Sequence, residues 1–283
     1  MSNKTVNYEK LIQDYLFDLT IQNMSKETIS TRKSLLTTFF KNNEDIDETN
    51  FKEKYQQYIL KIKENVSEGY IYQLVISIKG FCKHHKLNWA NEINTPKVAK
   101  SLPKHLNQKE IKQLFNTINI DPKDTEHKKK IKTQKLCILN LLYSTGLRVS
   151  ECVSLKKTQI NFDENLIRVR GKGNKDRIVI FNEETKTLLK QIITDKEYVF
   201  PAIRGEWHIT KRYVQKFIKE CGEQAKINQK VTPHLLRHSF ATQLLHNGCN
   251  LKGIQQLLGH NSLATTQIYT NVDLTDLKQM YSL

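Results

Sequence analysis

Apolar side chains recur at helical spacing through most of this 283-residue chain, and that pattern restricts the chain to a mainly α fold. In the first such segment the apolar face consists of Tyr8, Leu11, Ile12, Tyr15, Leu16 and Leu19. A face of this kind stabilises a fold only when it packs against another one. We therefore expect bundled helices rather than isolated ones.

The first part of the chain contains four of these segments. Their apolar residues fall within 8–19, 28–40, 51–62 and 70–81, and Ser67 is placed to cap the last segment. Four short amphipathic helices can bury their faces as a small bundle, so we predict a helical domain over residues 1–93. Lysines and arginines between the apolar positions suit either phosphate contacts or a solvated surface.

The helical pattern stops in NEINTPKVAKSLPKH, which begins at residue 91. This stretch has two prolines, three lysines and no long apolar face, a composition typical of a linker. We predict a linker at residues 94–106 and a second domain at residues 107–283.

The second domain begins with further helices. NQKEIKQLF is a capped helix start, whereas the Lys-rich DPKDTEHKKKIKTQ is expected to be an exposed loop before an apolar helix at residues 136–143. Gly146 should end that helix, and Arg148 should open a short one. Arg148 could bind an anion beside the first backbone N–H groups, or it could be a structural arginine paired with Glu151.

One region of the second domain changes from helical to strand character. Residues 166–170 and 177–181 are rich in Ile and Val, and GKGN between them is a turn sequence. We predict a β-hairpin with Lys172 near its tip. The glycines on either side of Lys172 allow close approach to a ligand, although most lysines in turns are merely solvated. GKGNK lacks the spacing of a P-loop.

Two more helices are expected after the hairpin, at residues 183–193 and 210–221, with a short buried segment YVFP between them. The second helix is rich in Lys and Arg and should end at Gly222. It suits a major-groove contact, and equally a solvated face.

Charge limits the class of partner. Lys and Arg number 45 against 29 Asp and Glu, a formal net charge of +16. Such an excess favours a polyanion, either nucleic acid or an anionic membrane surface, although a generally Lys-rich surface is the simpler alternative. Apolar runs are too short to span a membrane and the polar N-terminus is unlike a signal peptide, so we expect a cytoplasmic protein without a membrane partner. The five scattered cysteines form no CxxC pair and indicate neither a zinc ribbon nor a disulfide framework.

Residues 232–270 hold the densest group of chemically useful side chains. Thr232 and Pro233 form a helix start, and His234 and Arg237 are three residues apart and so lie on one side of that helix. A second helix ends at Gly259, directly before His260, and Tyr269 follows near the end of a third.

Each of these residues also has a simpler interpretation. His234 and His238 have the spacing of a metal-binding pair, but HLLRH lacks the Glu of HExxH and its Arg would repel a cation, so zinc is disfavoured. Any of the histidines could be a core residue, and Tyr269 could be a packing tyrosine. Together, however, the segment offers a Tyr nucleophile and cationic donors for a phosphodiester. We predict that it holds most of a DNA-cleaving site with Tyr269 as the nucleophile.

Five motifs in order, TGLRVSE, GKGNK, PHLLRHSFAT, LLGH and TTQIYT, resemble the tyrosine recombinase (phage integrase) family, and the similarity is closest to its Xer-type members. The resemblance covers essentially the whole chain. It implies a four-helix SAM-like core-binding domain and an α-rich catalytic domain with a small β-hairpin or sheet, which together clamp DNA. The site residues it implies are Arg148, Lys172, His234, Arg237, His260 and Tyr269, with no cofactor and no metal.

The resemblance also implies a role for each residue. Arg148 and Arg237 would hold the non-bridging phosphate oxygens, His234 would act as base and His260 as a hydrogen-bond donor to the phosphate. Lys172 would protonate the 5′-oxygen that leaves when Tyr269 attacks. The product would be a 3′-phosphotyrosyl bond, formed without ATP.

The partners follow from the same resemblance. They are double-stranded DNA with a specific recombination site and a tetramer on two duplexes, either a homotetramer or a heterotetramer with a second recombinase, with an accessory activator as a further partner. The expected role is Xer-like dimer resolution or integration and excision of a mobile element. A type IB-like topoisomerase and a non-catalytic DNA-binding module are the alternatives.

Overall fold

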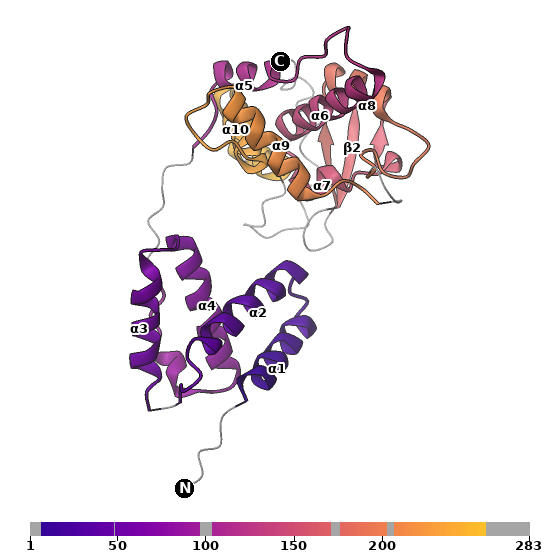
Figure 1. Ribbon diagram of the computed structural model, residues 1–283. Coiled ribbons are helices and arrows are strands. Elements are labelled where there is room, and N and C mark those ends of the chain that lie inside the picture. Colours follow the sequence, from indigo (N-terminus) through magenta and orange to yellow (C-terminus); the bar gives the residue numbers. More distant parts are fainter. Residues whose placement is uncertain (1–6, 48, 97–103, 171–175, 203–206, 259–283) are drawn as a thin grey trace. The chain divides into compact units, whose positions relative to one another are not determined.

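The computed structural model describes residues 7–47, 49–96, 104–170, 176–202 and 207–258 (Figure 1). The chain divides into two compact units, Met1–Ser101 and Leu102–Leu283. The point of division falls inside the segment predicted as a linker, residues 94–106. The domain limits of 1–93 and 107–283 stay a prediction.

The first unit is helical, as the spacing predicts. Its elements are α1 (Tyr8–Ile21), α2 (Lys26–Lys41), α3 (Phe51–Lys63), α4 (Glu68–His84) and the 3₁₀ turn η1 (Asn88–Asn91). Ser67 caps α4 by accepting a hydrogen bond from the Tyr70 backbone N–H. Ser25 caps α2 in the same way.

Aromatic rings fill the core of the first unit. Phe39 lies at its centre, with ring contacts to Phe40, Phe51 and Tyr58. Trp89 of η1 stacks on Phe51 with ring centroids 4.1 Å apart. The turn after α4 is therefore part of this core and holds the end of the unit against α3.

The second unit combines helices with one small sheet. Its elements are α5 (Gln108–Asn116), α6 (Glu126–Thr145), α7 (Val149–Val153), η2 (Lys157–Gln159), β1 (Ile160–Asn161), β2 (Leu166–Arg170), β3 (Asp176–Ile180), α8 (Glu183–Ile192), α9 (Lys211–Gln224), α10 (Pro233–His246) and α11 (Leu251–Leu258). Helix α6, whose second half is buried, packs against α8 and α10 and forms the centre of this unit (Figure 1).

The predicted hairpin is present as β2 and β3. The two strands pair antiparallel, with Leu166 opposite Ile180 and Arg170 opposite Asp176. A third strand, β1, pairs with the outer side of β2 and completes a sheet of order β1-β2-β3. The pattern missed β1 because two residues are too few to show alternation. The hairpin tip with Lys172 lies outside the described residues.

The prediction of a loop across the Lys-rich segment is wrong for most of its length. Helix α6 begins at Glu126, and Thr125 caps it by accepting from the Lys128 N–H. Lysine is a good helix former, because its straight side chain loses little freedom in a helix. The charged lysines of this segment keep it at the surface but do not prevent it from forming a helix. Lys129 forms an ion pair with Glu126 within the first turn.

The expected helix end at Gly222 is also wrong, since α9 continues to Gln224. A Cβ at Gly222 would lie 2.5 Å from Cγ2 of Val231. This glycine therefore allows a close approach inside the fold rather than a change of chain direction.

None of the helices that the structure describes is long and apolar enough to cross a membrane.

Candidate active site

The structure describes three of the six predicted site residues. Arg148, His234 and Arg237 lie in the second unit, on the α6–α7 connection and on α10. Lys172, His260 and Tyr269 lie outside the described residues. The described part of the candidate site therefore consists mainly of the two arginines and the groups that hold them.

Arg148 is the residue that precedes α7. Its backbone N–H donates to Glu151 Oε2 at 2.7 Å, and its Nη1 donates to Glu151 Oε1 at 2.9 Å. The carboxylate thus fixes both the start of the helix and the guanidinium, which remains partly exposed. The pairing with Glu151 expected of a structural arginine is present, and it leaves the side chain accessible to an anion.

Arg237 is buried in α10, with only 4% of its surface exposed. Its Nη1 donates to the Gly146 carbonyl and its Nη2 to the Leu258 carbonyl. One side chain thereby ties the end of α6 to the end of α11. A guanidinium has five N–H donors, and these two contacts leave others to reach a ligand.

Burial and the nearby positive charges of Arg148 and Arg177 lower the pKa of Arg237 to about 10. That value still leaves the group charged at pH 7. Among the residues that the structure describes, no carboxylate forms an ion pair with Arg237. A buried cation without an ion-pair partner is a feature of sites that receive an anion.

Arg177 of β3 is a third arginine at this place, and none of the motifs in the sequence includes it. Its Nη1 and Nη2 donate to Glu151 at 2.8 and 2.7 Å, and its Nε donates to the Leu257 carbonyl at 3.0 Å. Arg177 therefore positions Glu151, which in turn holds Arg148. Side chains alternate between the two faces of a strand, and the neighbouring Ile178 is exposed, so Arg177 points inward. An arginine at an inward position of a predicted strand was the sequence signal that could have revealed its role.

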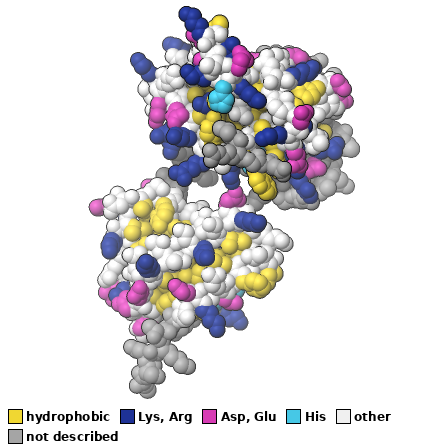
Figure 2. Space-filling model, turned by 45° about the vertical axis from the view of Figure 1, so that its right-hand side comes forward, with side chains coloured by type: hydrophobic (Ala, Val, Ile, Leu, Met, Phe, Trp, Pro, Cys, Tyr) yellow, Lys and Arg dark blue, Asp and Glu magenta, His cyan; other side chains and the backbone are white. Residues whose placement is uncertain are grey.

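The charges of this arginine cluster, defined as Arg148, Arg177 and Arg237, do not balance. Across the described residues, Glu151 is the carboxylate that interacts with all three guanidiniums. The excess of positive charge suits a phosphodiester, which gains a further negative charge during attack. Lys and Arg elsewhere are spread over the visible face of both units rather than gathered in one patch (Figure 2).

The histidines of α10 lie beside the cluster in sequence but differ in setting. His234 is exposed in the first turn of the helix, where a substrate could reach it. His238 is partly buried, and burial together with His105 and His234 lowers its pKa. His238 is therefore mostly neutral at pH 7. Ser239, the next residue of α10, accepts a hydrogen bond at its Oγ from the Leu106 backbone N–H at 2.8 Å.

A cavity of about 560 Å³ lies between α5, α6 and α10, with Phe115, Tyr143 and Phe240 among its lining residues. None of the arginine cluster lines it. The cavity is thus separate from the arginine cluster.

Replacing Glu151 with Gln is expected to destabilise the protein by about 3–5 kcal/mol at pH 7, because it leaves the buried Arg177 without its counter-charge. Urea unfolding measures this change. Glu183→Gln is the matched control, since that carboxylate is 74% exposed, and its effect should be close to zero. Equal effects of the two substitutions would contradict this account of Glu151.

The same pair predicts a pH dependence. Burial alone would raise the pKa of Glu151, but the hydrogen bonds from Arg177 and Arg148 hold it below its usual value. The stabilisation is therefore complete above the unfolded pKa, about 4.3, and is lost as the pH falls through the folded value. The stability difference between wild type and Glu151→Gln should shrink over that acidic range.

Gly146 should tolerate a side chain less well than Gly248, although both have positive φ angles, +62° and +85°. A Cβ at Gly146 would lie 2.6 Å from Leu258 Cδ2 and 2.7 Å from Phe240 Cδ1, whereas none of the described atoms lies within 4 Å at Gly248. We expect Gly248→Ala to cost about 1 kcal/mol and Gly146→Ala about 2–4 kcal/mol in urea unfolding. Similar losses would mean that Leu258 and Phe240 move aside freely.

Comparisons with known proteins give one consistent result. The model of the phage integrase family matches residues 104–275. The tyrosine recombinase XerA of Pyrococcus furiosus is 36% identical over 291 residues, which cover 99% of this chain and 95% of the relative. A crystal structure of XerA recombinase has a TM-score of 0.50 at 31% identity, covering 96% of this chain and 97% of that one. The XerH recombinase bound to its difH substrate, at 23% identity, has a TM-score of 0.65 and covers 100% of this chain and 91% of that one.

Proposed function

The chain belongs to the phage integrase family and is a site-specific DNA recombinase similar to Xer recombinases, and we propose that it cleaves DNA through a covalent bond to Tyr269. The observation that carries the proposal is the arginine cluster, in which Arg148 and Arg237 are held close together with excess positive charge. The product is a 3′-phosphotyrosyl bond and a free 5′-hydroxyl.

The two arginines of the predicted site bind the scissile phosphate. Arg237 is held by carbonyls of two elements and Arg148 by Glu151, so both guanidiniums are oriented before DNA arrives. Each can donate to a non-bridging oxygen and stabilise the charge that builds there as the phosphorus becomes five-coordinate. This electrostatic stabilisation replaces a metal ion in the proposed reaction.

Proton transfer completes the step. The Tyr269 oxygen attacks phosphorus and its proton passes to His234, whose exposed position on α10 supports access to DNA. The bond from phosphorus to the 5′-oxygen breaks, and Lys172 gives that oxygen a proton. His260 donates a hydrogen bond to the phosphate. The 5′-hydroxyl of a second DNA then reverses the reaction, because the phosphotyrosyl bond conserves the energy of the phosphoester.

The partners in this proposal are double-stranded DNA with a specific site and three further recombinase protomers. Strand exchange between two duplexes requires four strand cuts, which supports a homotetramer or a heterotetramer with a second recombinase, working in the cytoplasm. The relative XerH is described in complex with its difH substrate, which supports DNA as the ligand here. The biological role is dimer resolution or mobile-element integration and excision, with an accessory activator as a further partner.

A suicide substrate tests the cleavage directly. Genomic sites bound by the protein are mapped first, and one is made as a duplex nicked beside the cleavage position, so that the freed fragment diffuses away. We expect a covalent protein–DNA adduct that survives denaturing electrophoresis. Absence of the adduct on bound DNA would favour a non-catalytic module, and relaxation of a supercoiled plasmid lacking the site would favour a type IB-like topoisomerase.

A further inference from the structure

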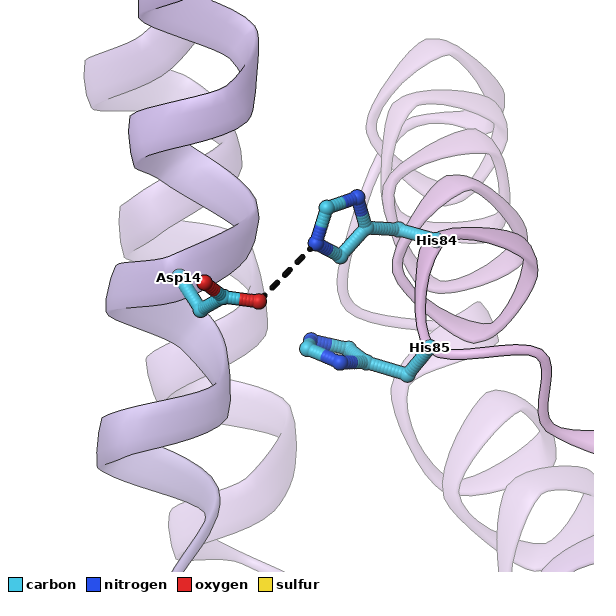
Figure 3. Close-up of side chains that lie close together, drawn as sticks. All are labelled: Asp14, His84 and His85. Carbon is cyan, nitrogen blue, oxygen red and sulfur yellow. Dashed lines mark hydrogen bonds and ion pairs between the residues drawn. The ribbon is translucent and has the colours of Figure 1, made fainter.

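A second group of chemically active side chains lies in the first unit, between α1 and the end of α4. Asp14 of α1 faces His84, the last residue of α4, and His85, the residue that follows (Figure 3). Each offers one potential ligand atom, and these atoms all lie within 4.8 Å of one another. No step of the proposed recombination reaction uses them.

The contacts of the two histidines resemble those of metal ligands. His85 Nε2 lies 2.9 Å from the Leu11 carbonyl, so it carries the proton and leaves the lone pair on Nδ1. His84 Nδ1 lies 3.3 Å from the Asp18 carboxylate, which favours a proton on Nδ1. Metal-binding histidines usually donate their second ring N–H to a carboxylate or a backbone carbonyl, which orients the ring.

The remaining nitrogen of His84 also faces a carboxylate. Its Nε2 lies 3.0 Å from Asp14 Oδ2. Both ring nitrogens of His84 thus face carboxylates, an arrangement that a doubly protonated ring satisfies and that a metal ion at Nε2 satisfies as well. A metal ion bound to both Nε2 and Oδ2 would replace the proton and lie to one side of the line between the two atoms, because 3.0 Å is too short for two in-line bonds of about 2.0–2.1 Å.

We propose that Asp14, His84 and His85 bind a divalent transition-metal ion of the zinc class, which joins α1 to the end of α4. Two imidazoles and one carboxylate favour zinc over magnesium or calcium, which prefer oxygen ligands. With zinc–ligand bonds of about 2.0–2.1 Å, tetrahedral ligand atoms lie about 3.3 Å apart, so small side-chain movements complete the site.

Packing already restricts both rings near this geometry. The His85 ring lies edge-on to Phe81 with centroids 4.7 Å apart, and the His84 ring lies 5.4 Å from Tyr15. The two histidine rings are themselves 4.6 Å apart and perpendicular. Rings held by neighbours lose little further freedom when a metal binds, which favours affinity.

The test uses the full-length protein after treatment with a chelator, titrated with Zn²⁺ at pH 7.5 by calorimetry. We expect one equivalent bound with a dissociation constant on the order of micromolar. At a hundredfold excess over that constant, the melting temperature of the first unit should rise by about 10 °C, and chelator should reverse the rise. This stabilisation does not depend on DNA cleavage, so it separates the metal site from the proposed function.

Three variants locate the binding. Asp14→Asn and His85→Gln should each weaken Zn²⁺ binding at least about tenfold and remove the thermal shift, and Asp18→Asn should weaken it about 10–100-fold through the His84 ring. Asp14 has a side chain that is 64% exposed, so Asp14→Asn should fold normally. His238→Gln is the control, because it removes one member of the closely spaced pair His234 and His238 in the second unit. This variant should still bind one equivalent of Zn²⁺. Wild-type protein that binds Zn²⁺ no more tightly than Asp14→Asn and His85→Gln would overturn the proposal.

Discussion

Tyr269→Phe is expected to abolish the covalent protein–DNA adduct completely while DNA binding changes by less than about twofold. The substitution removes only the phenolic oxygen that would attack phosphorus. Binding depends mainly on cationic contacts to phosphates, and these are unchanged. The measurement is adduct formation on the nicked suicide substrate at protein concentrations that saturate the DNA, with affinity determined separately by gel shift.

The matched control for this prediction is Tyr143→Phe, the same loss of one oxygen from α6 of the same unit. Tyr143 is half-buried against Phe115 and lines the cavity that none of the arginine cluster lines, and its substitution should leave the rate of adduct formation unchanged. Full adduct formation by Tyr269→Phe would mean that another side chain is the nucleophile.

The helical part of the fold was predictable because its signal is local. Spacing of apolar residues and capping by Ser67 depend on a few neighbouring positions, and α4 begins where Ser67 predicts. The prediction of a loop at the Lys-rich start of α6 was wrong for a physical reason. A solvated stretch of helix needs no apolar face when its residues favour the helical backbone.

The candidate site was predictable only in part. Residue types and order made Arg148 and Arg237 candidates, yet the contacts that hold them join positions far apart in sequence. Arg237 reaches Gly146, 91 residues away, and Arg177 reaches Leu257, 80 residues away. No local pattern encodes such pairs. What the sequence did contain was an arginine on the inward face of a strand, which requires a buried partner and here has Glu151.

These long-range contacts give the arginine cluster a second role beyond charge. Arg177 and Arg237 bind successive carbonyls at the end of α11, those of Leu257 and Leu258. Helix ends have carbonyls without helical partners, and cations stabilise them. The residues that follow α11 include His260, so Arg237, which would bind the phosphate, also fixes together with Arg177 the point from which the rest of the predicted site continues.

Arg237→Lys is expected to slow cleavage by about 10²–10³-fold although the charge is retained, because an ammonium group cannot serve two carbonyls and a phosphate oxygen at once. DNA affinity should change little, since the number of cationic groups is the same. Single-turnover cleavage of the suicide substrate measures the rate. Arg168→Lys, at an exposed position of β2, is the control for the same exchange and should cleave at the wild-type rate.

The pH dependence of this variant distinguishes a catalytic from a purely structural role. Burial and the charges of Arg148 and Arg177 lower the pKa of Arg237 to about 10, which is above the working range. The same surroundings would lower the pKa of a lysine at this position below its free value of about 10.4. Arg237→Lys should therefore lose further activity at alkaline pH, where its ammonium group releases its proton, while the guanidinium of the wild type stays charged to higher pH. A variant that is slow but has the pH profile of the wild type would indicate that Arg237 acts only by holding α6 and α11 together.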